Sequence, residues 1–113
     1  MKISELAGKI EAEIITKNVD AEREVECGYT CDLLSWVMAN GSEGMAWVTV
    51  QTHMNVIAVA TLHDMSCVII PEGIKVEDDV AAKADEEGIA ILTSPLGAYD
   101  ICGRMNACGI PAK

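Results

Sequence analysis

Two short segments carry side chains of the kinds that bind small ligands. The first runs Gln51-Thr52-His53-Met54-Asn55, between an apolar strand-like run and an apolar helix-like run. At such a junction the first amides of the helix have no partner within it and attract an anion. We therefore predict a site for a small anionic or nucleotide-like ligand, lined by Gln51, Thr52, His53 and Asn55. In the alternative interpretation Thr52 caps the helix, and His53 and Asn55 satisfy backbone groups.

The second segment runs from Gly28 to Asp32 and leads from a predicted strand into a predicted helix. Gly28 permits a tight turn, Tyr29 offers a ring and a hydroxyl, and an aspartate near a helix start can hold a ribose or an amine. We predict that Gly28, Tyr29 and Asp32 complete the same pocket. Capping of the helix by Thr30 or Asp32 is the alternative.

The cysteines and histidines do not have the spacing of a metal site. Two cysteines, Cys27 and Cys31, are four apart, but no second close pair follows. His53 and His63 lie at opposite ends of one predicted helix, roughly 15 Å apart, so they cannot share a metal ion. We expect no metal and no cofactor, and cysteines that pack as small apolar side chains. An iron–sulfur or zinc site built from Cys27, Cys31 and a partner chain, or a redox-sensing thiol, are the alternatives.

No set of residues typical of an enzyme is present. The sequence has no Gly-x-Ser-x-Gly turn, no His-Glu-x-x-His pair and no Gly-x-x-x-x-Gly-Lys-Ser/Thr phosphate loop. The acidic residues between positions 72 and 87 are predicted to lie mostly on a solvated helix face. We therefore expect a protein without catalytic residues, and not a kinase.

Composition limits the remaining classes. The 113 residues predict one domain, 1–113, and half of them are hydrophobic. Eighteen acidic and eight basic residues give a net charge of −10, which disfavours nucleic acid and anionic membranes as partners. The longest apolar run, Val56–Leu62, is too short to cross a bilayer. With no signal-like start and an odd number of cysteines, we expect a cytoplasmic protein with reduced thiols.

The hydrophobic pattern predicts strands and helices in alternation. Strands are expected at 13–16, 22–28, 46–50, 67–70 and 89–92, and helices at 5–10, 32–40, 56–62 and 76–87. A last helix is expected to begin with Ser94 as N-cap and Pro95 as first residue, with an inward stripe at every third position from Leu96 through Tyr99 to Cys108. Strands joined through helices form parallel sheets, so we predict a three-layer α/β sandwich with a mainly parallel sheet. Ligands then bind beyond the carboxyl ends of strands, at 51–55, 71–73 and 93–94.

Three stretches resemble a stand-alone DRTGG domain: Arg23–Ser35, Trp47–Asn55 and Cys67–Gly73. Of the motif that names the family, Arg23 and Gly28 are the residues kept. The stretch from Val68 to Ile110 is also similar to the amino-terminal, non-catalytic domain of HPr kinase/phosphorylase.

This resemblance implies a DRTGG-like α/β fold and a regulatory or dimerising module without catalysis. Related domains occur beside phosphotransacetylase catalytic domains and between CBS domains of regulated pyrophosphatases. Some relatives are encoded near iron-only hydrogenases, which implies an alternative role as an interaction or assembly factor for a redox enzyme. We predict a homodimer with Trp36 or Trp47 near the contact, because large aromatic residues often anchor interfaces.

Overall fold

Four of the five strands run parallel and form one continuous sheet with a short antiparallel strand at its edge. The computed structural model describes residues 1–113. The strands lie in the order β1 (Glu13–Ile14), β5 (Ala90–Thr93), β4 (Cys67–Ile70), β3 (Met45–Val48) and β2 (Cys27–Thr30). Only the β1–β5 pair is antiparallel. All residues of β3 and β4 are buried, as expected of central parallel strands covered on both faces.

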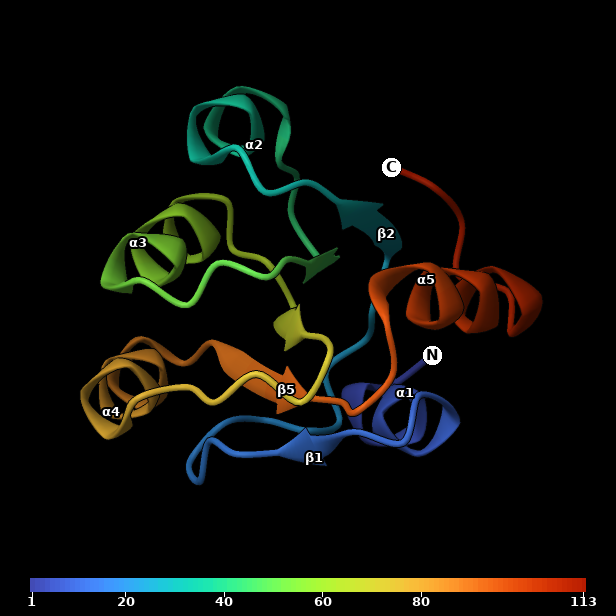
Figure 1. Cartoon of the computed structure of the whole chain (residues 1–113). Helices are drawn as coiled ribbons and strands as arrows, with labels where there is room; N and C mark the ends of the chain where they lie inside the picture. The colour runs from blue at the N-terminus through green and yellow to red at the C-terminus, as the bar shows by residue number, and fades with distance from the viewer.

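The helices cover both faces of this sheet. After β2, β3 and β4 the chain forms α2 (Leu34–Asn40), α3 (Met54–Leu62) and α4 (Asp78–Glu87), which lie together on one face (Figure 1). The other face is covered by α1 (Ile3–Lys9) and α5 (Ala98–Ala107). The predicted three-layer α/β sandwich with a mainly parallel sheet is therefore confirmed.

Successive residues of the strands supply two separate hydrophobic cores. In β3, Trp47 packs under α2, α3 and α4, whereas Ala46 and Val48 pack under α1 and α5. Strands β4 and β5 alternate in the same way, because neighbouring side chains of a strand point to opposite faces. None of the helices has the length and apolar composition of a membrane-spanning segment.

The segment expected as a strand at 22–28 pairs mostly outside the sheet. The Val25 N–H donates to the Met1 carbonyl, and the Glu26 N–H donates to the Gly44 carbonyl. The ladder with β3 begins at Cys27 and runs through Thr30. Gly28 and Tyr29 are therefore strand residues rather than turn residues, and the turn predicted at Gly28 is wrong.

The last helix also differs from the prediction. Its N-cap is Gly97, whereas Ser94 donates its hydroxyl to the Ile10 carbonyl at 2.7 Å and ties β5 to the end of α1. Tyr99 is 94% exposed, and the buried residues are Ile101 and Met105, four apart. A strict three-residue repeat rotates by about 60° per step around an α-helix, so it cannot stay on one face.

Asp85, predicted to lie on a solvated helix face, has a structural role. Its carboxylate accepts hydrogen bonds from the backbone N–H groups of Lys17 (2.9 and 3.0 Å) and Asn18 (2.7 Å). These bonds fasten the 17–18 turn to the last turn of α4 and hold the pKa of Asp85 below its usual value. The carboxylate thus secures the chain that follows β1.

We expect Asp85→Ala to lower the urea midpoint of unfolding at neutral pH, whereas Glu86→Ala, the exposed neighbour, leaves it nearly unchanged. Because the pKa is lowered on folding, the stabilisation is present above the usual value of 3.8 and is lost as the pH falls through the lowered folded-state value. The midpoints of wild type and Asp85→Ala should therefore converge in acid. A gap that stays constant into acid would contradict a role for the charge.

Candidate ligand-binding site

The loops after β2 and β3 are locked together at the carboxyl edge of the sheet. Asp32 Oδ1 accepts hydrogen bonds from the Thr49 hydroxyl at 2.8 Å and from the Val50 N–H at 2.9 Å. The Gln51 side-chain amide donates to the Asp32 carbonyl at 3.2 Å, and the Gln51 N–H donates to the Thr49 hydroxyl, also at 3.2 Å. Two of the predicted site residues, Asp32 and Gln51, are therefore in direct contact.

Neither residue proposed as a cap of α2 acts as one. The N-cap of this helix is Leu33, which makes no side-chain capping bond. Asp32 instead joins the two loops, and the Thr30 hydroxyl donates to the Val48 carbonyl at 3.0 Å. The capping interpretation of this segment is wrong, while the Oδ2 atom of Asp32 has no hydrogen-bond partner in the protein.

His53, and not Thr52, caps α3. Its Nδ1 accepts a hydrogen bond from the Asn55 N–H at 3.1 Å. In the neutral ring this places the proton on Nε2, which is exposed and has no protein partner. The Thr52 hydroxyl and the Met54 N–H likewise have none. Three hydrogen-bond donors are thus free where α3 begins.

The segment that carries these donors has no charged side chain of its own. From Met45 to Leu62 the sequence has no Asp, Glu, Lys or Arg, and Asp32 is the one carboxylate bonded to this segment. The dipole of α3 adds partial positive charge at its first turn. The start of α3 is therefore suited to an anion although the protein as a whole is acidic.

Asn55 faces away from the Asp32 lock. It lines a groove of about 360 Å³ between α3 and α4, together with Ala58, Lys83 and Glu87. Its backbone N–H is held by the His53 cap. Asn55 thus lies beside the other predicted ligand residues in sequence, but its side chain borders a different hollow.

Gly28 and Tyr29 border another hollow, at the outer edge of β2. This cavity of about 370 Å³ lies between β2, α5 and the C-terminal tail, and no residue of 51–55 lines it. The tail pairs with β2 because the Gly28 N–H donates to Pro111 and the Gly28 carbonyl accepts from Lys113. A Cβ on Gly28 would lie 2.8 Å from Met105 Cε. Met105 Cε is the end of a flexible side chain that can shift, so packing against α5 does not by itself require a glycine at this position.

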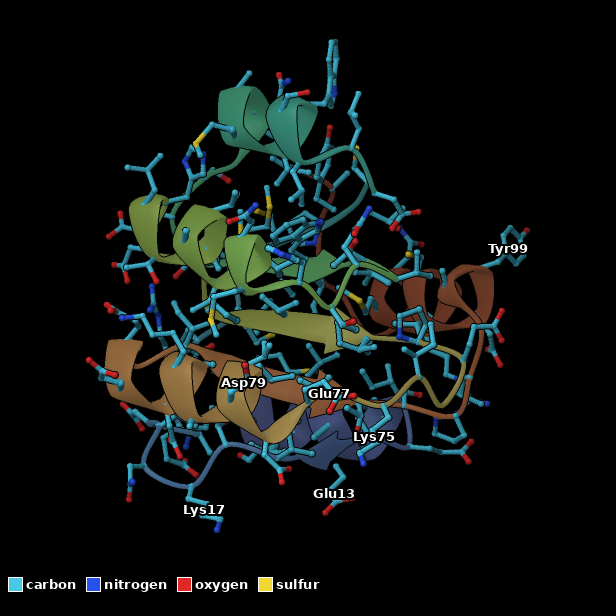
Figure 2. All side chains as sticks on the ribbon, turned by 60° about the vertical axis from the view of Figure 1, so that its left-hand side comes forward. Glu13, Lys17, Lys75, Glu77, Asp79 and Tyr99 are labelled. Carbon is cyan, nitrogen blue, oxygen red and sulfur yellow. The ribbon has the colours of Figure 1, made fainter.

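A larger cavity of about 470 Å³ lies at the carboxyl ends of β4 and β5. It includes Gly73 and Thr93, from the strand ends that the sequence identified, and also Lys75 and Glu13, which the sequence analysis missed (Figure 2). Glu13 comes here because β1 pairs antiparallel with β5 and places Glu13 opposite Thr93. Such pairing of a two-residue strand has no signal in the sequence.

The five cysteines are free thiols, and no three His, Cys, Asp or Glu side chains come together as metal ligands. Cys67 is fully buried in β4, and burial raises the pKa of its thiol to about 12. Cys27 Sγ lies 3.5 Å from the Ser42 hydroxyl, and Cys31 Sγ contacts the Leu33 carbonyl. His53 and His63 bound α3 at opposite ends, as expected.

The lock between Asp32 and Thr49 can be measured by a double-mutant cycle. Thr49→Val removes a buried hydroxyl that bridges Asp32 and the Gln51 N–H, and it should lower the free energy of unfolding by about 1–3 kcal/mol. Asp32→Ala should also destabilise the protein, and the double variant should lose less than the sum of the two. Strictly additive losses in urea unfolding would contradict the lock.

Cys67 should resist thiol reagents in the folded protein. The thiolate is the reactive form, and a thiol with a pKa of about 12 forms almost none at mildly alkaline pH. We expect peptide mass spectrometry to find Cys67 unlabelled in native protein and labelled in urea, with half-buried Cys31 as the internal reference. Equal labelling of Cys67 and Cys31 in the native protein would show that β4 opens.

Comparison with known proteins identifies the fold. No protein-family model matches the sequence, and no curated protein matches it in sequence. Among solved structures, the chain is similar to the regulatory region of Clostridium perfringens pyrophosphatase, which consists of CBS and DRTGG domains and was crystallised with its activator, diadenosine tetraphosphate. The TM-score is 0.72 at 13% identity, over 92% of this chain and 45% of that one. The chain therefore has a DRTGG-like α/β fold, which confirms its resemblance to DRTGG domains at the level of the fold.

Proposed function

We propose that the protein is a non-catalytic regulatory module that binds a small anionic, nucleotide-like ligand at the start of α3 and acts as a homodimer. The observation that carries this proposal is the group of free donors at the start of α3: the His53 Nε2–H, the Thr52 hydroxyl and the Met54 N–H. They lie in a segment without a charged side chain, in a protein of net charge −10. The similar fold of a regulatory region that was crystallised with a dinucleotide activator supports the same class of ligand.

In this proposal each residue has a distinct part. A phosphate group accepts from the Met54 N–H, the Thr52 hydroxyl and the His53 ring, as anions do at helix N-termini. Asp32 holds the loop in place through Oδ1 and offers Oδ2 to a ribose hydroxyl. Gln51 lies against Asp32 and borders the same loop. Asn55, Gly28 and Tyr29 line other hollows, so they have no part in this phosphate site, and their contact with a ligand stays a prediction.

The larger cavity at β4 and β5 is a poorer place for an anion. Glu11 and Glu13 both line it, against the single cation of Lys75. Arg104 pairs with Glu11 at 3.1 Å, which leaves Glu13 without a partner. A phosphate there would meet the Glu13 carboxylate as well as Lys75, whereas at the start of α3 it would meet three free donors, with the Asp32 carboxylate in the neighbouring loop.

The proposal includes no chemical step. The Nδ1 lone pair of His53 is held by the Asn55 N–H, and no serine, cysteine or acidic side chain is hydrogen-bonded to the ring. A nucleophile activated by this histidine would need such a bond. Binding, and not turnover, is the activity that these groups support.

A second candidate is an interaction or assembly factor for a redox enzyme such as an iron-only hydrogenase. The acidic first turn of α4 favours it, because Glu77 and Asp79 (Figure 2), together with Asp78, are exposed and form no ion pair. A basic partner would be attracted to such a surface. Pairing that weakens steeply with added salt would distinguish this role from ligand binding.

Isothermal titration calorimetry with diadenosine tetraphosphate and with ATP tests the main proposal. Hydrogen bonds to charged groups contribute about 1.5–3 kcal/mol, so Thr52→Ala and His53→Ala should each weaken binding by roughly tenfold or more. Tyr99→Ala, an exposed change on α5, is the matched control and should bind like wild type.

Two outcomes would contradict the proposal at different levels. Wild-type protein that binds neither nucleotide would reject nucleotide binding itself. Binding that survives both Thr52→Ala and His53→Ala unchanged would place the ligand away from α3.

A further inference from the structure

Helix α2 is exposed to an extent that is unusual for a helix without charges. Of its seven residues only Val37 is buried, and no ionisable residue occurs from Leu33 to Ser42. Trp36 is 56% exposed and Leu33, the N-cap, is 62% exposed. The solvent face of a helix in a globular protein is normally charged or polar. The outer face of α2 is instead typical of a surface that another protein covers.

The neighbouring helix α3 extends the same surface. Its outward residues are also uncharged and include Leu62, which is 65% exposed. Five of the six large exposed apolar side chains belong to α2, to α3 or to the loops that precede these helices. We call these five residues the α2–α3 face: Leu33, Trp36, Met38, Val50 and Leu62.

Hydrogen bonds at both ends join the two helices of this face. At one end Asp32, beside Leu33, accepts from the Val50 N–H at 2.9 Å. At the other end His63 Nε2 lies 2.7 Å from the Met38 carbonyl oxygen. The helices therefore lie side by side on one side of the sheet (Figure 1), and Leu62 marks the border of the face toward α4, where it lines a groove with Lys83 and Glu87.

We infer that the α2–α3 face is where a second copy of this chain docks. This inference rests on the homodimer of the proposed function and names its contact. None of the 26 charged residues of the chain lies in either helix, so the net charge of −10 is carried by the remaining surface. Two copies that met through acidic surfaces would repel each other, whereas contact through α2 and α3 buries no charged side chain from either helix.

The chemistry of the face favours a copy over a charged partner. A basic protein would be attracted to the acidic turn of α4, not to helices without carboxylates. In a twofold dimer the same patch must match itself, and an apolar, uncharged face meets this requirement without opposite charges. Trp36 is the anchor, since exposed tryptophans at contact centres contribute strongly to binding. Trp47 is excluded from this role because it is fully buried, with its indole N–H donated to the Cys31 carbonyl at 2.9 Å.

The dimer contact borders the proposed ligand site. Val50 belongs to the face, and its N–H is bonded to Asp32, while Gln51 is the next residue of the same loop. A second copy seated on α2 and α3 would thus lie beside the start of α3.

Light scattering coupled to gel filtration tests the inference over a wide range of protein concentration. Trp36→Glu places a carboxylate on each copy at the centre of the contact and should convert a dimer to a monomer. Tyr99→Glu adds the same charge at an even more exposed aromatic residue on α5, in the opposite layer (Figure 2), and should stay dimeric like wild type. Circular dichroism and urea unfolding check that both variants are folded.

A second measurement needs no variant. Hydrogen exchange of wild-type protein at low and high concentration should slow with concentration at 33–42 and 54–62, and not in α5. If Trp36→Glu fails to fold, hydrogen exchange of the wild-type protein alone tests the dimer contact. Exchange at α2 and α3 that does not change with protein concentration would overturn the inference.

The remaining outcomes separate the contact from the function. A Trp36→Glu protein that is still dimeric overturns the α2–α3 contact and leaves the homodimer standing. Wild-type protein that is monomeric at every concentration overturns both. Calorimetry with diadenosine tetraphosphate on the same samples reports ligand binding separately, so a monomer that binds the nucleotide overturns the dimer alone.

Discussion

Burial of β3 and β4 on both faces is the constraint on which the other elements depend. Every residue of these strands is buried, so both faces of the sheet require a helical layer. The core under α2, α3 and α4 includes Trp47, and the core under α1 and α5 includes Val48. Polar side chains have no place within the central strands, and they collect where the strands end. The lock between Asp32 and Thr49 and the donors of Thr52 and His53 lie at this edge.

The charged side chains are distributed unevenly, so that one region of the surface is neutral and the rest is acidic. Net charge is −10, yet the stretch from Met45 to Leu62 contains no Asp, Glu, Lys or Arg. That stretch contributes the whole of β3, the donors of the candidate ligand site and the whole of α3. The same lack of charge that admits an anion beside α3 also permits a second copy to approach the outer side of α2 and α3. Ligand binding and dimerisation are thus proposed for adjoining parts of one neutral region.

Much of the fold could be predicted from the sequence, because it depends on local patterns. The apolar runs at 67–70 and 89–92 identified the buried strands to within a residue, and the alternation of strands and helices gave the parallel order. Where tertiary contacts determine the end of a helix or strand, local sequence patterns did not predict that end. Ser94 resembles a helix cap, but its hydroxyl is bonded to Ile10 at the far end of the chain. The site was located only in part, since the pairing of Glu13 with Thr93 and the position of Asn55 over α4 depend on packing between distant segments.

The most direct test of the central claim, that an anionic nucleotide binds at the start of α3 without being consumed, is a nuclear magnetic resonance titration with diadenosine tetraphosphate. Amide spectra report where the ligand binds, and phosphorus spectra of the same sample report whether it stays intact. We predict shifts concentrated at 32 and 49–56, with the phosphorus signals of the ligand unchanged over time apart from binding. Shifts concentrated at 11–15 and 73–76 instead, or hydrolysis of the nucleotide, would contradict this account.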